Sequence, residues 1–318
     1  MAKCMSEKYL RLMPEVSQIV IHKRQVILNT LPPTLSNSNY QKLADKVDSF
    51  EQRSGISPTT RADLEVQIEH YNSALSTIKL GRDEKLAMLY IMLNRYVKRV
   101  PQAGLFDTDN PAVPSKRIVA DSGIADGGRI LLLHEYGRPY YYGIDAICDG
   151  SAENAEQFLQ LASRLVSASE ARIVRGDSSS LPSAYQHKLL MEKANEVVRE
   201  WIFPRHAEVK KLCMYIAAEC KRKSLEPNAS LGGGANAFGI LDEEFDELPV
   251  KHSELAHTLK FGVAYGALSI KRNHGTKKRL WTLIELTGPF LITQGLTLSR
   301  GGFLEKQLKD LLFPLEEA

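Results

Sequence analysis

The sequence predicts a mainly α-helical fold that ends in a smaller part with a short β-hairpin. Two observations lead to this prediction. Over most of the first two hundred residues, apolar side chains recur at steps of three and four, which is the spacing of one helix face. Near residue 270 the pattern changes to two β-like segments that flank a polar, basic stretch. A chain of 318 residues is long enough for two domains or for three small ones.

The first hundred residues are predicted to form a multi-helix region, residues 1–101. Its opening, before Pro32 and Pro33, is ambiguous between helix and strand. Three helical patterns follow, over residues 38–53, 60–80 and 82–99. Asp83 is suited to be a negative charge at the N-terminus of the third helix. Residues 102–128 contain four glycines, two prolines and four aspartates with little periodicity, and we interpret them as a connector between domains.

Helical pattern resumes in a middle region, residues 129–204. A mostly apolar segment at 130–136 is followed by a short helix at 142–148. Ser151 is placed to cap a longer helix that runs to about residue 167. A further helix spans residues 183–202 and ends before Pro204.

The last region, residues 205–318, has a specific order of elements. An amphipathic helix at 206–223 is followed by a loop with three consecutive glycines (232–234) and then by an acidic patch at 242–247. The next helix, residues 253–267, leads directly into the β-hairpin. Its predicted inner face consists of Leu255, Leu259 and Val263.

The hairpin concentrates positive charge. Five of the nine residues from 271 to 279 are lysine or arginine, and none is acidic. We place its tight turn at NHGT, residues 273–276, and its returning strand at 281–286, with Trp281 in the core. A helix followed by a hairpin with a basic tip and a returning strand is the order of a winged-helix domain, a form of the helix-turn-helix fold. The sequence therefore predicts a C-terminal winged-helix domain.

A winged helix implies a site for double-stranded DNA. The helix before the hairpin enters the major groove, and the hairpin tip reaches phosphate or the minor groove, where basic side chains release condensed counterions. The predicted phosphate contacts are Lys271, Arg272, Lys277, Lys278 and Arg279. The predicted contacts on or beside the helix are His252, His257, Thr258 and Lys260, and His274 in the turn is a further candidate. A basic hairpin that is only solvated, or that docks a protein, stays open as the alternative.

The composition confines any basic site to such a local cluster. Hydrophobic residues make up 43% of the chain and charged residues 25%, yet the net charge is only +3. The four cysteines, Cys4, Cys148, Cys213 and Cys220, form no C-x-x-C pair and no zinc-ligand spacing, so we interpret them as small buried residues. No apolar run approaches membrane-spanning length, and the first residues lack the apolar core of a signal peptide. We therefore expect a cytoplasmic protein that does not contact a membrane.

The middle region contains the stretches YGRPYYYGID at residues 136–145 and NAEQFL at residues 154–159. Together they resemble the helical lid of origin-recognition-like AAA+ ATPases, and the resemblance covers roughly residues 125–318. In that family a winged helix follows the lid, so the resemblance implies a lid-like region at 129–204. Two positions depart from the family's G-N-x-R motif, because Glu153 stands where the glycine would fall and Glu156 where the nucleotide-sensing arginine would fall. No G-x-x-x-x-G-K-[ST] phosphate loop is present either, so the resemblance implies a chain without the ATPase motor.

Motifs for catalysis are not apparent in the sequence. His134 and Glu135 lack the second histidine of H-E-x-x-H, and no G-x-S-x-G occurs. Glu192, Lys193 and Glu196 are interpreted as the solvated face of a helix. The three tyrosines at 140–142 suit aromatic packing better than base stacking. We expect no catalytic residue, cofactor or metal site.

Two functional hypotheses follow. The first is a non-catalytic DNA-binding accessory subunit of a larger assembly, for example a mobile-element or antiviral-defence system with a separate ATPase or nuclease as its protein partner. The second is a protein-interaction scaffold whose helices at 60–99 dock a partner and whose winged helix is structural or also docks a partner. A cryptic enzyme would require carboxylates from distant segments to converge in one pocket.

Overall fold

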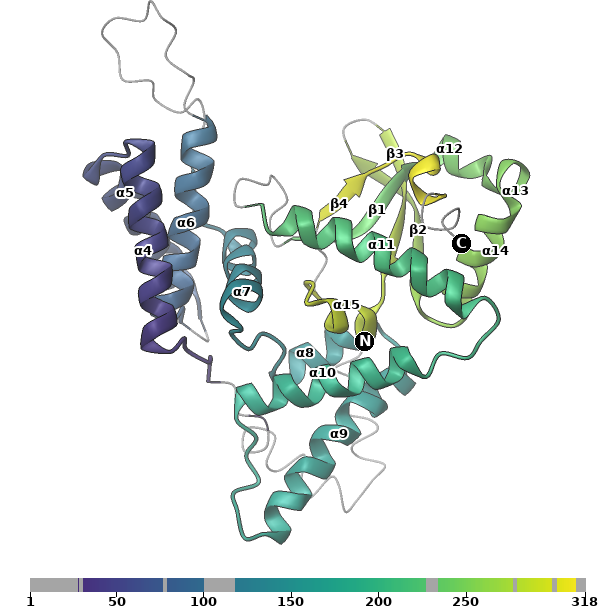
Figure 1. Cartoon of the computed structure of the whole chain (residues 1–318), viewed down its shortest axis with the longest axis horizontal. Helices are drawn as coiled ribbons and strands as arrows, with labels where there is room; N and C mark the ends of the chain where they lie inside the picture. The colour runs from purple at the N-terminus through teal and green to yellow at the C-terminus, as the bar shows by residue number, and fades with distance from the viewer. Residues whose placement is uncertain are drawn as a thin grey trace, which may run out of the picture. The chain divides into compact units, whose positions relative to one another are not determined.

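The computed structural model describes residues 28, 31–76, 79–99, 118–226, 234–276, 279–298 and 302–312. The chain is mainly helical with a small four-stranded mixed sheet towards its C-terminal end, as the sequence predicts at this level (Figure 1). It divides into two compact units. The helical unit consists of residues 34–138 and 222–234, and the sheet-containing unit of residues 1–33, 139–221 and 235–318. The described part of the segment predicted as a connector, residues 118–128, therefore lies within the helical unit, and the regions predicted at 129–204 and 205–318 both contribute to the sheet-containing unit.

The helical unit is built from helices whose ends are marked by the sequence. Its described helices are α4 (Asn37–Ser54), α5 (Pro58–Ala74), α6 (Arg82–Arg99) and α7 (Ser122–Tyr136). Ser36 and Ser57 accept backbone N–H groups at the starts of α4 and α5, and Gly55 and Gly137 end α4 and α7 in the left-handed conformation. The predicted spans 38–53 and 82–99 agree with α4 and α6 to within one residue at each end, whereas the predicted span 60–80 continues six residues beyond the end of α5.

Helix α7 begins inside the segment that the sequence assigns to the connector. Its N-cap is Asp121, whose side chain accepts the Ile124 N–H at 2.8 Å. The first two turns of α7 contain three glycines, so few apolar side chains mark a helical periodicity there. A Cβ on Gly128 would lie 3.4 Å from the Cβ of Ala87, so α7 packs closely against α6 at this point. This contact joins residues far apart in sequence, and a local pattern does not contain it.

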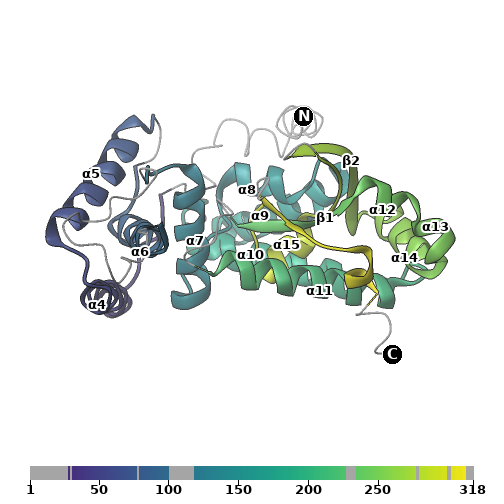
Figure 2. The ribbon, with the colours of Figure 1, turned by 90° about the horizontal axis from the view of Figure 1, so that it is seen from above.

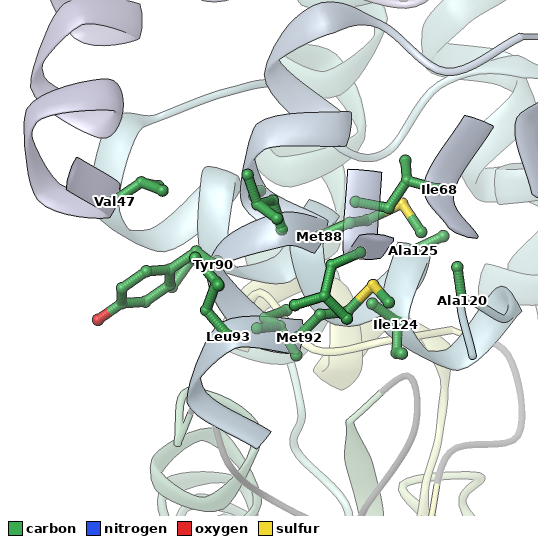
Figure 3. Close-up of a cluster of buried hydrophobic side chains, with 14 of the residues drawn as sticks. Val47, Ile68, Met88, Tyr90, Met92, Leu93, Ala120, Ile124 and Ala125 are labelled. Carbon is green, nitrogen blue, oxygen red and sulfur yellow. The ribbon is translucent and has the colours of Figure 1, made fainter. Parts of the chain in front are cut away.

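The core of the helical unit gathers around α6 (Figure 3). Met88, Met92 and Leu93 of α6 are fully buried, and Val47 of α4 and Ile124 of α7 join the same cluster. Every residue of α6 from Ala87 to Leu93 is buried, because neighbouring helices cover it on more than one side. The buried surface of α6 is therefore wider than the single apolar stripe of an amphipathic helix, and only towards its end does an apolar side chain, Val97, become 40% exposed.

A buried ion network lies at the start of α6. Asp83, 0% exposed, accepts the Leu35 N–H and the Arg138 Nε–H, each at 2.9 Å. Glu84 accepts the Arg129 Nε–H at 2.7 Å and the Gly81 N–H at 2.8 Å. Asp83 thus balances a buried guanidinium instead of only facing the helix dipole in solvent.

The sheet-containing unit holds the remaining described helices. They are α8 (Gly143–Gly150), α9 (Ala155–Val174), α10 (Ser183–Arg199), α11 (His206–Ser224), α12 (Asp242–Asp246), α13 (Leu248–Lys251), α14 (Ser253–Ala264), α15 (Gly288–Gln294) and the short 3-10 helix η1 (Leu308–Leu311). The N-cap of α9 is Asn154, not Ser151 as predicted. Ala152 and Glu153 adopt positive φ values of 46° and 64°, so the chain turns once more before the helix starts, and the Ser151 hydroxyl instead donates to Cys148 O.

Four strands form the sheet in the order β2-β3-β1-β4. They are β1 (Ala235–Leu241), β2 (Leu268–Thr276), β3 (Arg279–Leu286) and β4 (Gly302–Glu305). β1 pairs with β3 in antiparallel and with β4 in parallel orientation. α11 lies across one face of the sheet, where Tyr215 contacts Phe238 edge-on (Figure 1). α12, α13 and α14 lie together beside the sheet at one end of this unit (Figure 2).

The strands β1 and β4 and the helix α15 are not predicted from the local sequence pattern. Residues 235–240 of β1 are all buried, so this central strand lacks the alternation that identifies a half-exposed strand. Glycine is needed at position 239, because a Cβ there would lie only 2.3 Å from the nearest ring atom of Phe303 on β4. Long-range pairing, and not local pattern, defines these elements.

The tyrosines at 140–142 belong to the packing of this unit. Tyr141 is 0% exposed, and its hydroxyl donates to Leu296 O at 2.7 Å. Its backbone N–H donates to His187 Nδ1 at 3.2 Å, and the two rings stack. The interpretation of Tyr141 as a packing residue is confirmed.

Candidate nucleic-acid interface

The predicted β-hairpin is present, but its turn is displaced from the predicted position. β2 and β3 are antiparallel, and their outermost described pair is Thr276 with Arg279. The chain between them is Lys277 and Lys278, which lie outside the described residues. The stretch at 273–276, predicted as the turn, instead continues β2, with His274 paired to Trp281. Trp281 is 4% exposed, so its core assignment is confirmed.

Asn273 forms an irregularity within β2 where the sequence suggested a turn. Its φ is +58°, and the strand register shifts between Lys271 and His274. Asparagine tolerates this left-handed conformation better than most residues, which explains why the sequence looks like a turn. The irregularity divides the hairpin into a base, residues 268–272, and an outer part that ends in the basic tip.

Two of the predicted phosphate contacts lie in the base and already have acidic partners. Lys271 forms an ion pair with Glu285 on the neighbouring strand. Arg272 forms an ion pair with Asp246 of α12 and lies over the Phe245 ring, 5.7 Å from its centroid. Each of these two cations therefore has an acidic partner within the protein, in an ion pair that is partly exposed to solvent.

Asp242 holds the irregular part of the hairpin. This carboxylate is 8% exposed and accepts the Asn273 N–H at 3.2 Å and the Thr282 hydroxyl at 2.5 Å. It is the first residue of α12, directly after β1. Together with Asp246 it connects α12 to both strands of the hairpin. We name Asp242, Asp246 and Phe245 the α12 brace.

The acidic patch at 242–247 is visible in the sequence, but no role is predicted for it there. Its negative charge is the signal that could have indicated such a role, because carboxylates close in sequence to a basic hairpin can neutralise the charge of that hairpin. Which carboxylate meets which cation could not be read from the sequence, because the sheet order decides it.

Arg279 lies at the outer end of the described part of the hairpin. Arg279 is exposed, and among the described residues no carboxylate forms an ion pair with it. His274 is exposed at the opposite strand, with its ring edge-on to Phe303 at 5.6 Å. With the two lysines at 277 and 278, the chain has three consecutive cations at this end of the hairpin.

Helix α14 precedes the hairpin as predicted, but its candidate residues do not all face solvent. Thr258 is 0% exposed and its hydroxyl donates to Glu254 O at 3.0 Å, so the structure removes it from the candidate contacts. His257 and Lys260 are exposed, and His252, half-buried, occupies the N-cap position. Val263, predicted to face inward, is 41% exposed.

The described cysteines and acidic groups show no other site. Cys148, Cys213 and Cys220 are buried, and burial raises the pKa of the Cys220 thiol to about 12. Across the described ranges, His, Cys, Asp and Glu side chains do not gather in groups of three that could hold a metal ion. The helices in the described part of the chain are all too short or too polar to cross a membrane.

Comparison with models of protein families, with curated proteins and with solved structures found no match for this chain.

Proposed function

We propose that residues 205–318 form a winged-helix domain that binds double-stranded DNA through the tip of its hairpin. The order α11, β1, α12–α13, α14, β2, β3 supports this assignment, because it places a helix directly before the hairpin and pairs the returning strand with β1. The observation that carries the DNA proposal is the contrast within the hairpin. Its base is neutralised by acidic partners, whereas its outer end combines an exposed Arg279 with two lysines.

The proposed interface is smaller than the set that the sequence suggested. The tip residues Lys277, Lys278 and Arg279 supply the phosphate contacts, with His274 beside them. His257 and Lys260 are the exposed polar residues of α14 that are retained as groove contacts, and His252 lies next to them. Arg272 acts through the α12 brace and holds the hairpin against α12, whereas Lys271 pairs with Glu285 across the two strands of the hairpin.

The salt dependence of duplex binding tests this division. Each phosphate contact contributes about 0.9 to the slope of log affinity against log salt, so replacing Lys277, Lys278 and Arg279 by Ala should reduce the slope by about 2 to 3. The double change Lys271→Ala and Arg272→Ala should leave the slope within about 0.5, because those cations are already paired. Fluorescence anisotropy of a labelled duplex between low and moderate salt measures both. Equal losses in the two variants would contradict the proposal.

We further propose that the chain is a non-catalytic accessory subunit related to the lid and winged-helix portion of origin-recognition-like ATPases. Two features at the start of α9 support the relationship. Glu153 adopts φ +64°, a conformation that favours glycine, at the position where the lid motif has its glycine. Asn154, the motif's asparagine, caps α9 through the Glu156 and Gln157 N–H groups. Glu156 would repel a nucleotide phosphate, which fits a lid that has lost its nucleotide role.

The partner of such a subunit would be a separate ATPase or nuclease. The proposal predicts that the purified chain alone does not hydrolyse ATP, with or without duplex DNA, and that it binds DNA nevertheless. Phosphate release above the level of a buffer control by the pure chain would contradict the non-catalytic assignment.

A protein-docking function is the second candidate, because apolar side chains are exposed around α14. Val250 is 88%, Tyr265 52% and Val263 41% exposed. An exposed apolar surface is less suited than a basic surface to a helix that binds in the major groove of DNA. Failure of the chain to bind duplex DNA at low salt would favour the docking function over the DNA proposal.

A further inference from the structure

The sheet-containing unit has a pocket that none of the proposed DNA contacts lines. It has a volume of about 480 Å³ and is bounded by α10, α11 and α15, with α15 between the other two helices in Figure 1. This volume lies in the range of pockets that hold one small molecule. Its apolar lining is Val198, Met214 and Phe290. Val198 and Phe290 are buried, while Met214 is 46% exposed and offers a polarisable surface.

The carboxylates that line the pocket are already neutralised by cations that do not line it. Glu192 pairs with Arg164 at 3.4 Å, and Glu196 with Lys193 at 2.6 Å. The Lys193 ammonium lowers the pKa of Glu196, which keeps that carboxylate ionised and engaged.

The two cations that line the pocket are not compensated in this way. Arg199 of α10 and Lys210 of α11 are both exposed. Within the described ranges, neither has a carboxylate at ion-pair distance, and Arg199 acts on Glu196 only at longer range. The pocket therefore combines an apolar lining with two available positive charges on different helices.

We propose that this pocket binds a small amphipathic organic anion. Its carboxylate, phosphate or sulfonate group lies between Arg199 and Lys210, because a guanidinium and an ammonium are the usual partners of such groups. Its flat apolar part lies against Met214, the exposed apolar side chain of the lining. The limited volume and the two cations favour a single small molecule over a polyanion.

A fluorescent probe with this chemistry tests the proposal. Anilinonaphthalene sulfonate has one sulfonate and a flat apolar body, and phenylnaphthylamine is a matched neutral probe. Titration of the full chain at about 0.15 M salt should saturate with the anionic probe at one site below about 1 mM. The double variant Arg199→Gln, Lys210→Gln should weaken binding about tenfold or more.

The matched control is Lys211→Gln, Lys309→Gln, which removes the same net charge from exposed residues that do not line the pocket. This control should bind the anionic probe within about twofold of the unchanged chain. Met214→Glu is a second pocket variant and should also weaken binding, because it adds a like charge beside the sulfonate. Equal losses in both double variants, equal affinity for the neutral probe, or no saturation of the unchanged chain would each overturn the proposal.

Discussion

The side chain of Asp242 helps to fix the conformation of the hairpin. Its carboxylate is the acceptor for the Asn273 N–H at the strand irregularity and for the buried Thr282 hydroxyl. A buried hydrogen-bond donor that loses its acceptor retains the full desolvation penalty, because no other group replaces the acceptor. The conformation of Asn273 therefore depends on a residue 31 positions away in sequence.

We expect Asp242→Ala to destabilise the sheet-containing unit by about 1 to 3 kcal/mol, because two donors lose their acceptor. The midpoint of urea unfolding, followed by tryptophan fluorescence, measures the change. Glu243→Ala is the control, since Glu243 is the exposed neighbour in α12 and its loss should cost less than about 0.5 kcal/mol. Equal effects of the two substitutions would show that Asp242 does not hold the hairpin.

His187 makes stability depend on pH. Its Nδ1 accepts the Tyr141 N–H, and burial lowers its pKa from 6.5 to about 4. The unfolded chain therefore binds a proton below pH 6.5 that the folded chain does not bind. Stability should fall as the pH drops from 6.5 to about 4, by up to about 1.4 kcal/mol per pH unit.

His187→Asn should remove this part of the pH dependence, because an amide oxygen can accept the same N–H without titrating. Urea unfolding at pH 7 and pH 5 gives the comparison, with exposed His257→Asn as the control. If His187→Asn retained the full loss between these pH values, other groups would be responsible for it.

At the scale of elements, a helix of the middle region, α8, and a helix of the C-terminal region, α15, are in direct backbone contact at two glycines. The end of α8 and the start of α15 approach so closely that a Cβ on Gly288 would lie 1.6 Å from Gly150 O. Glycine at 288 is therefore a requirement of helix packing. Regions that looked separable in sequence are joined by this contact within one unit.

Gly288→Ala should destabilise the sheet-containing unit by about 3 kcal/mol or more, because the backbone of α15 must move away from α8. Thermal unfolding followed by circular dichroism measures the loss. Gly275→Ala is the control, since a Cβ at this exposed position would meet no atom within 4 Å. A melting temperature for Gly288→Ala equal to that of the control would contradict the close packing.

The buried ion network ties α6 to the segments before and after it in the helical unit. Asp83→Ala would leave the Arg138 guanidinium, 3% exposed, without its closest carboxylate. We expect a loss of about 3 to 5 kcal/mol in unfolding free energy. Lys85 also lies on α6, and Lys85→Ala breaks its exposed ion pair with Glu69 of α5, which should cost less than about 1 kcal/mol. A small effect of Asp83→Ala would mean that water compensates Arg138.

At the scale of the whole molecule, a net charge of +3 leaves little long-range attraction for a polyanion. In the proposed function, affinity for DNA therefore comes from the hairpin tip, and the α12 brace holds the base from which that tip extends. The same principle applies to the pocket between α10, α11 and α15. In both places carboxylates neutralise some cations and leave others available.

The sequence by itself determined the helices whose ends are locally encoded and the existence of the hairpin. Ser36, Ser57 and Gly55 mark helix boundaries through contacts within a few residues, so a local pattern is sufficient to place them. Two β-like segments close in sequence form a hairpin for the same reason.

Only the tertiary structure decided which of the candidate DNA contacts are available. Thr258 is buried by its neighbours, and Arg272 meets Asp246 because sheet order brings residues 26 positions apart together. The central strand β1 likewise exists through its pairing with β3 and β4. Burial and charge compensation depend on distant partners, and a one-dimensional pattern does not contain those distances.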